Sequence, residues 1–328
     1  MIRNLATKIL LLVGRITGRF ITFHTRPMVP AGLGYTGKET PEDALCAIVI
    51  QGPIRHEDNF TLESVKLYRR HYPSATIILS TWEGEDITAF QSLKDARFKI
   101  LLNVPPPLPA PGNLNYQIVS TKAGVDEAHK LGFLYVIKSR TDQRIYSINL
   151  IRYLQNLTDY FPVLDTNRQK QRILGTAAAT SKIRLYQFSD IFMFGTVSDM
   201  RTYWSADLVL DPTVDERAFH AEGYLFKQFL ERTGWDIKET MPDFLKALGQ
   251  RAIIIDNELM DVYWPKYVSR LREHRIKTYV LPELQITFKS WLNECFMPAI
   301  AIKGSNPFVP TSLGRCANRK FARAPRSS

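Results

Sequence analysis

The feature that most constrains the fold is an alternation of short apolar runs with helix-like segments between residues 45 and 137. Each run has the length and the aliphatic content of a buried strand, and the runs lie at 45–50, 76–79, 98–102 and 133–137. Helices are expected between them, at about 59–72, 87–93 and 115–130. Asn59 would cap the first helix and Gly132 would end the last. This order predicts an α/β fold with a mostly parallel, doubly wound, Rossmann-type sheet and helices on both faces.

Beyond residue 144 the alternation is less regular, although no internal repeat or linker interrupts it. Helices are expected at 148–154, 215–230 and 263–275, and strand-like runs at 173–180 and 192–194. We therefore expect a single domain over residues 41–302. A basic amphipathic segment (1–40) would precede it, and a basic, flexible tail (303–328) would follow.

The excess of positive charge lies in the two ends of the chain. The formal net charge is +11, yet residues 1–38 and 303–328 each hold six cations and no acid. The stretch between them, 39–302, therefore has 31 basic residues against 32 acidic ones. Because nucleic-acid binding needs a basic surface on the folded domain, this distribution argues against it. It favours adhesion of the two ends to an anionic surface.

The N-terminal segment has the pattern of an amphipathic helix. Its uninterrupted apolar run, residues 9–13, is far shorter than the roughly 20 residues needed to span a bilayer. Arg15 and Arg19 follow four residues apart, beside Ile16 and Phe20. We expect this segment to lie on an anionic membrane surface, which for a bacterial source would be the cytoplasmic face of the inner membrane. The alternative is an ordinary helix packed on the domain.

Several common nucleotide-binding and hydrolase motifs are missing. No GxGxxG follows the first strand-like run and no GxxxxGK[ST] occurs, so neither a dinucleotide-binding turn nor a P-loop is expected. HExxH and GxSxG are absent as well, which argues against the common zinc peptidases and serine hydrolases. Ligand-binding residues are therefore expected at the ends of the strands.

Four charged residues lie at the end of the fourth strand-like run: Lys138, Arg140, Asp142 and Arg144. In an extended chain alternate residues point to the same side, which would place all four together. Ligands of open α/β sheets bind beyond the carboxyl ends of the strands, and three cations around one carboxylate suit a phosphate-bearing ligand. The alternative is a structural cluster of ion pairs at the edge of the sheet.

Three segments resemble the WavE family, which is associated with lipopolysaccharide synthesis and related to glycosyltransferases of the GT-A fold. They are residues 47–54 (AIVIQGPI), 136–144 (VIKSRTDQR) and 189–195 (SDIFMFG), of which the second is the most specific. Their order and spacing extend the resemblance over roughly residues 45–300, without the two basic ends. It implies a GT-A-like catalytic domain that carries a nucleotide-sugar on its sheet.

The resemblance also implies a role for the charged strand end. Many GT-A enzymes hold the donor's diphosphate through a metal ion on an Asp-x-Asp motif. The matching stretch here is Arg140-Thr141-Asp142, with a cation in place of the first acid. Asp142 alone would then bind Mn²⁺ or Mg²⁺ together with the phosphates. Equally, Lys138, Arg140 and Arg144 would neutralise the leaving diphosphate without a metal.

Two acids are candidates for the base that an inverting sugar transfer needs. Glu222 stands near the start of a helix-like segment, where many inverting GT-A enzymes carry an acid, although such an acid can also serve the helix dipole. Asp190 is the second candidate, for acceptor binding or as the base, with a turn or cap role as the alternative. Gln51, Gly52 and Pro53 would lie beside the donor's nucleoside, or simply form a tight turn.

The leading interpretation is a glycosyltransferase that moves a sugar from a nucleotide-sugar donor to a hydroxyl of a glycolipid or oligosaccharide acceptor at a membrane surface. The first alternative is a nucleotidyltransferase, although no glycine-rich phosphate loop lies near Gln51. The second is a catalytically inactive, membrane-tethered protein that binds nucleotide or glycan, which the cation at position 140 permits.

Overall fold

The centre of the molecule is a seven-stranded sheet with the strand order β3-β2-β1-β4-β7-β6-β8. The computed structural model describes residues 36–298 except 94, 216–218 and 265–283, together with positions 8–9, 12–13 and 15–18. The strands of this sheet are β1 (Cys46–Gln51), β2 (Thr76–Trp82), β3 (Phe98–Asn103), β4 (Tyr135–Arg140), β6 (Ile173–Thr176), β7 (Met193–Thr196) and β8 (Ala252–Ile255).

Strand β7 is the only one in this sheet that runs against its neighbours, since β4 and β6 both pair with it antiparallel and all other pairs are parallel. It therefore begins at the edge where the parallel strands end. In the register, Met193 at its start lies opposite Lys138 of β4 and Gly175 of β6. The loop that precedes β7 is thereby brought to the carboxyl ends of β4 and β6.

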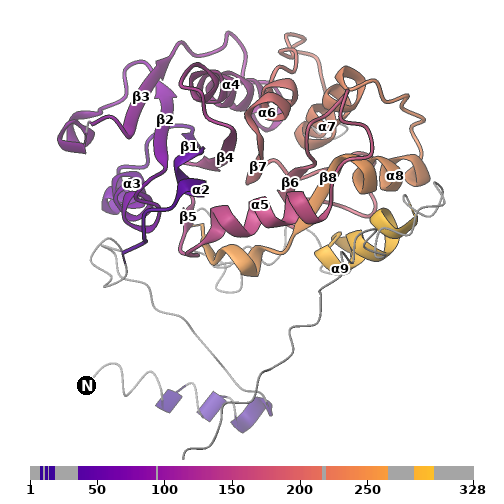
Figure 1. The fold of residues 1–328 in the computed structure, drawn as a ribbon, viewed down its shortest axis with the longest axis horizontal. Helices are drawn as coiled ribbons and strands as arrows, with labels where there is room; N and C mark the ends of the chain where they lie inside the picture. Colours follow the sequence, from indigo (N-terminus) through magenta and orange to yellow (C-terminus); the bar gives the residue numbers. More distant parts are fainter. Residues whose placement is uncertain are drawn as a thin grey trace, which may run out of the picture.

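Helices cover both faces of the sheet, with α4 and α6 on one face and α3 and α5 on the other (Figure 1). The α-helices are α2 (Pro41–Ala44), α3 (Phe60–His71), α4 (Leu114–Lys130), α5 (Leu150–Tyr160), α6 (Val197–Trp204), α7 (Ala221–Arg232), α8 (Met241–Arg251) and α9 (Phe288–Ser290). Helix α9 continues into a π-helical stretch, Trp291–Phe296. Short 3₁₀ helices lie at Glu57–Asn59, Thr88–Leu93, Pro111–Asn113 and Asn257–Met260. The predicted α/β class is confirmed.

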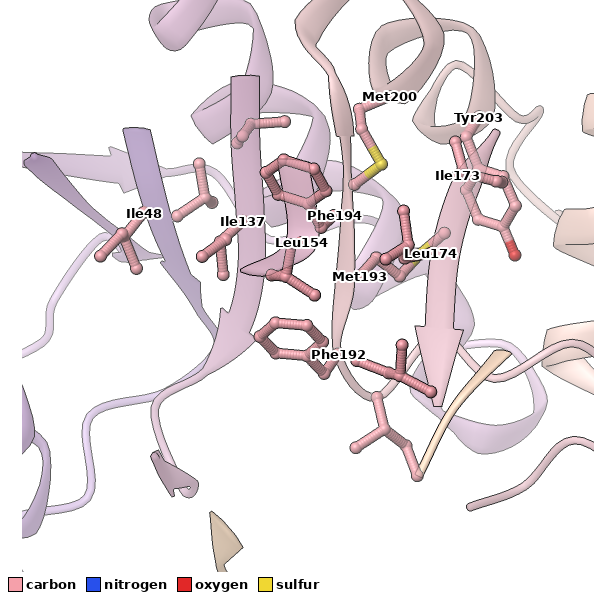
Figure 2. Packing of buried hydrophobic residues seen from close by; sticks show 14 of the residues in the cluster. Ile48, Ile137, Leu154, Ile173, Leu174, Phe192, Met193, Phe194, Met200 and Tyr203 are labelled. Atoms are coloured by element: carbon pink, nitrogen blue, oxygen red, sulfur yellow. The ribbon is translucent and has the colours of Figure 1, made fainter. Parts of the chain in front are cut away.

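The strands read as nearly continuous apolar runs because both faces of the sheet are covered. Figure 2 shows Phe192, Met193 and Phe194 packed between Ile137 of β4 and Leu174 of β6. All five side chains are 2% exposed or less. The antiparallel strand is therefore part of the same core as its parallel neighbours.

Several boundaries differ from those expected. Helix α3 begins directly after Asn59, but Asn59 has a left-handed backbone (φ 51°) and its side chain makes no capping hydrogen bond. Helix α5 extends to Tyr160, well past the expected end at residue 154. Tyr263 belongs to strand β9 (Val262–Tyr263), which pairs with β5 (Arg144–Ile145). The remainder of the helix expected at 263–275 lies outside the described residues, except for Trp264.

Most of the two basic ends also lies outside the described residues, including the whole tail 303–328. Of the N-terminal segment, positions 8–9, 12–13 and 15–17 are helical. The apolar side chains among them are exposed, namely Ile9, Leu12, Val13 and Ile16. None of the helices that the structure describes has the length and apolar character needed to cross a bilayer.

Candidate functional site

The carboxyl edge of the sheet brings together several of the residues selected from the sequence. Gln51, the last residue of β1, lies opposite Arg140, the last residue of β4. Asp142 follows two residues later, and Asp190 lies in the loop before β7 that reaches the same edge. Glu222 stands in the first turn of α7 and interacts electrostatically with Asp190.

The turn after β1 makes a close junction with the loop after β4. Gly52 has φ +116°, and a Cβ at this position would lie 3.0 Å from the hydroxyl oxygen of Thr141. The Thr141 N–H donates to the Gln51 carbonyl at 3.0 Å, and the Gln51 side-chain oxygen accepts from Ser120 of α4 at 2.9 Å. Glycine is thus needed for a tight turn here. Pro53 is exposed just beyond it.

Arg140 and Asp142 form a two-pronged ion pair at the rim of the site. The Nε and Nη2 groups of Arg140 donate to the two carboxylate oxygens of Asp142 at 2.8 and 3.0 Å. Both side chains remain 21% exposed, and the guanidinium lies 5.2 Å from the centre of the Trp264 ring. A planar guanidinium held in this way matches the geometry of phosphate oxygens as well as that of a carboxylate.

Lys138, by contrast, is completely enclosed. Its ammonium donates to the carbonyl oxygen of Asp190, lies 3.9 Å from that residue's Oδ2, and stands 4.9 Å from the centre of the Trp204 ring. Burial lowers the pKa of Lys138 to about 8, and the negative charge of Asp190 opposes this shift. The structure therefore places this cation on the Asp190 loop rather than at a ligand phosphate.

Arg144 also lies in the interior. Its guanidinium donates to the Ser64 hydroxyl at 3.0 Å and to the Phe60 carbonyl at 2.9 Å, and lies 4.2 Å from the centre of the Phe60 ring. These contacts tie β5 to the start of α3. The expectation that the four charged side chains share one side of an extended chain is wrong, because β4 ends at Arg140 and a turn separates it from β5.

Asp190 and Glu222 are two acidic groups close enough to affect each other. Asp190 is 4% exposed, and its Oδ2 has no hydrogen-bond partner among the described residues. Burial, followed by the negative charge of Asp190, raises the pKa of Glu222 to about 7. The backbone N–H of Glu222 itself, Arg184 and Lys138 act in the opposite direction. A carboxyl group with such a pKa can accept and release a proton near neutral pH.

Two aromatic residues at the end of α6 complete the buried part of the site, and neither was predicted from the sequence. The Tyr203 hydroxyl is fully buried without a hydrogen-bond partner in the described part of the chain. Burial and the charges of Asp190 and Glu222 raise the pKa of Tyr203 well above its ordinary value. Trp204 presents its ring to Lys138. Neighbouring aromatic residues on an apolar helix face are typical of core packing, so the sequence carried little signal for them.

The fit of a divalent metal ion rests on Asp142. Both of its oxygens accept from Arg140. Over the described ranges, no group of three or more His, Cys, Asp or Glu side chains is arranged to hold a metal ion. The described side chains thus form no complete ligand set, and a cation on Asp142 would take its other ligands from the donor's phosphates and from water, as Mg²⁺ commonly does.

A mostly parallel α/β sheet whose carboxyl edge gathers acids and cations defines this domain as GT-A-like. The family model described as WavE lipopolysaccharide synthesis matches residues 46–231, from the start of β1 into the last turn of α7. This is more than half of the chain, and the protein belongs to that family. The match begins where the resemblance was expected to begin and stops short of residue 300. A search among curated proteins found no match.

Proposed function

We propose that the protein is a glycosyltransferase that moves a sugar from a nucleotide-sugar donor to a hydroxyl group of a glycolipid or oligosaccharide acceptor. The reaction would belong to the synthesis of lipopolysaccharide or another surface polysaccharide, in keeping with the family. The observation that carries the proposal is the placement of Glu222, with a pKa of about 7, beside Asp190 at the edge where β1 and β4 end.

Glu222 would act as the catalytic base of an inverting transfer. It would take the proton of the acceptor hydroxyl while that oxygen attacks the anomeric carbon of the donor sugar. A pKa of about 7 leaves much of Glu222 ionised at neutral pH while keeping it a useful proton acceptor. Burial is the main cause of this pKa, and Asp190 would raise it further, because a second negative charge nearby disfavours ionisation of Glu222. Lys138 would hold Asp190 in place through its contacts with the carbonyl and the carboxylate of that residue.

Arg140 would stabilise the leaving nucleoside diphosphate. Its two parallel N–H groups, now on Asp142, can turn to phosphate oxygens that arrive at the same edge. Asp142 would hold Mn²⁺ or Mg²⁺ together with the phosphates, and the ion would supply further positive charge for the leaving group. Gln51, Gly52 and Pro53 would lie beside the nucleoside, since Gln51 ends β1, the strand next to β4, and the other two follow it directly.

The first test is thermal unfolding with UDP, GDP, CDP, CMP and ATP, each with and without Mn²⁺. A ligand at a hundred times its dissociation constant stabilises the fold by about 2.7 kcal/mol. We expect one nucleoside diphosphate to raise Tm, and Arg140→Gln to weaken that effect. If Mn²⁺ increases this rise in Tm in the wild type but not in Asp142→Ala, the ion binds at Asp142. The proposal fails if no nucleotide stabilises the protein, and release of pyrophosphate from a nucleoside triphosphate would instead identify a nucleotidyltransferase.

We also propose that the two basic ends hold the protein on an anionic membrane, which for a bacterial source would be the cytoplasmic face of the inner membrane. Six cations in each end and the exposed Ile9, Leu12, Val13 and Ile16 support this. Confinement beside a lipid-linked acceptor would raise the effective acceptor concentration. The full chain should sediment with phosphatidylglycerol vesicles, and Arg15→Glu/Arg19→Glu should reduce this. Equal sedimentation of both proteins would contradict the proposal.

A further inference from the structure

The rim of the site next to Glu222 carries a cation that the mechanism above does not use. Arg184 lies in the loop between β6 and β7, and its side chain is exposed. Within the described residues its guanidinium makes no hydrogen bond or ion pair, and its backbone carbonyl accepts from the Gln187 N–H at 3.3 Å. Residues 181–187 contain no acid that could neutralise it.

The loop that carries Arg184 is fixed by its neighbours. The Tyr186 side chain is buried, and its hydroxyl donates to Asp243 of α8 at 2.6 Å. On the other side of Arg184, the backbone N–H of Lys182 donates to the Leu284 carbonyl at 2.7 Å. The Leu185 carbonyl oxygen would lie 3.4 Å from a Cβ built on Gly223, so the loop packs on the first turn of α7. The backbone of residue 184 is therefore held beside Glu222.

The charge of Arg184 acts on both titratable groups at the start of α7. It lowers the pKa of Glu222 against the effect of burial. Burial lowers the pKa of His220, and the charge of Arg184 lowers it further. The other charged groups that act on Glu222 are Asp190, which raises its pKa, and Lys138, which lowers it. Lys138 is enclosed in the protein, whereas Arg184 is open to solvent. Of these two cations, Arg184 is the one that a ligand can reach.

We propose that Arg184 binds an anionic group of the acceptor, a phosphate or a carboxylate, and thereby places the acceptor's hydroxyl group next to Glu222. This inference rests on the proposed function. A base must contact the hydroxyl that it deprotonates, so a cation beside the base lies on the acceptor side of the site. Arg140, by contrast, ends β4 and Asp142 follows two residues later, where the donor's diphosphate is proposed to bind.

The test uses sulfate as the probe, because its charge stays constant over the pH range of the titration. Carbon-13 NMR of glutamate-labelled full-length protein, with Glu222→Gln for assignment, follows the pKa of Glu222 with and without sulfate. Sulfate should raise this pKa in the wild type. Arg184→Gln should raise it without sulfate and weaken sulfate binding about tenfold or more. Lys182→Gln is the matched control and should behave as the wild type, because Lys182 is already paired with Glu294.

The assignment of Arg184 is wrong if sulfate shifts Glu222 equally in the wild type and in Arg184→Gln, or if Lys182→Gln reproduces the Arg184→Gln result. UDP, GDP and CMP serve as a second set of probes in the same titration. A nucleotide response of Glu222 that disappears in Arg184→Gln would move Arg184 to the donor site and overturn its assignment to the acceptor. None of these measurements needs turnover. A sulfate site on Arg184 without any nucleotide binding would therefore refute the proposed function and leave the anion site standing.

Discussion

The site contains lysine and arginine side chains both in its interior, enclosed by protein atoms, and at its rim, open to solvent. In the interior, Lys138 and Arg144 direct their donors to protein atoms. At the rim, Arg140 keeps 21% of its side chain exposed and Arg184 is open to solvent. Three of them, Lys138, Arg140 and Arg144, lie in or just beyond the last residues of β4 and look alike in the sequence. Burial separates them, because an enclosed cation can serve only the protein's own oxygens whereas a rim cation can exchange its partner for a ligand.

The largest effect is expected for Glu222→Gln, because Glu222 interacts with an interior cation, Lys138, and with a rim cation, Arg184. If the partly buried acid is the base, turnover should fall by about 10²–10⁴-fold while nucleotide binding is kept. The measurement is single-turnover sugar transfer from a nucleotide-sugar that carries the nucleoside diphosphate identified by thermal unfolding. Glu231→Gln is the control, because Glu231 is exposed near the other end of the same helix. Unchanged turnover in Glu222→Gln would transfer the role of base to Asp190.

A second prediction compares an interior cation with a rim cation through stability. Lys138→Met leaves the Asp190 carboxylate buried without its cation, so the free energy of unfolding should fall by about 3 kcal/mol or more. Arg140→Met breaks a partly exposed pair and should cost about 1 kcal/mol or less. Urea unfolding of both variants at pH 7 gives the two values. Similar losses in the two proteins would remove the distinction between interior and rim.

The pH dependence of stability tests the placement of Glu222. Its pKa in the folded protein, about 7, lies above the ordinary value of 4.5, so the folded state binds this proton more tightly than the unfolded state. The free energy of unfolding should therefore fall as the pH rises from 4.5 to 7, by up to about 3 kcal/mol from this group, and stay low above pH 7. Glu222→Gln should lack this contribution. Urea titrations at pH 5 and pH 7.5 measure it, and identical pH slopes in the two proteins would contradict it.

Donor binding should separate Arg140 from Arg144. Arg140→Gln should weaken binding of the nucleoside diphosphate about tenfold, because a charge-assisted contact to the phosphates is lost. Arg144→Lys should lower stability, since a lysine cannot replace the bonds to Ser64 and the Phe60 carbonyl, and should leave nucleotide affinity unchanged. Isothermal calorimetry and urea unfolding measure the two properties. A weaker nucleotide affinity in Arg144→Lys would show that a buried arginine also contributes to nucleotide binding, and would contradict this prediction.

The sequence predicted the first half of the sheet because strand and helix periods are local. The apolar runs at 76–79 and 98–102 became β2 and β3 almost unchanged. The direction of β7 was not predicted, since the direction of a strand depends on its partners rather than on its own residues. The burial of Lys138 was hidden for a similar reason, because it comes from Trp204 and Asp190, more than fifty residues later in the chain. Arg184 has no local pattern at all, and only the packing of its loop on α7 places it beside Glu222.

The smallest expected effect concerns the Tyr203 hydroxyl. It is buried beside two acids and has no hydrogen-bond partner among the described residues. Tyr203→Phe keeps the ring in the core and removes a polar group whose desolvation is uncompensated. The variant should therefore be as stable as the wild type or more stable, by up to about 1 kcal/mol in urea unfolding.

Tyr186→Phe is the matched control for this prediction. The Tyr186 hydroxyl donates to Asp243 at 2.6 Å, so its removal should destabilise the protein by about 1 kcal/mol or more. Two tyrosines with buried rings, one with and one without a partner for its hydroxyl, should thus respond with opposite signs. A loss of stability in Tyr203→Phe equal to that in Tyr186→Phe would mean that Tyr203 donates to a group in the interior. The interior of the site would then include a hydrogen bond to one of its two acids, and Tyr203 would join Lys138 in holding them.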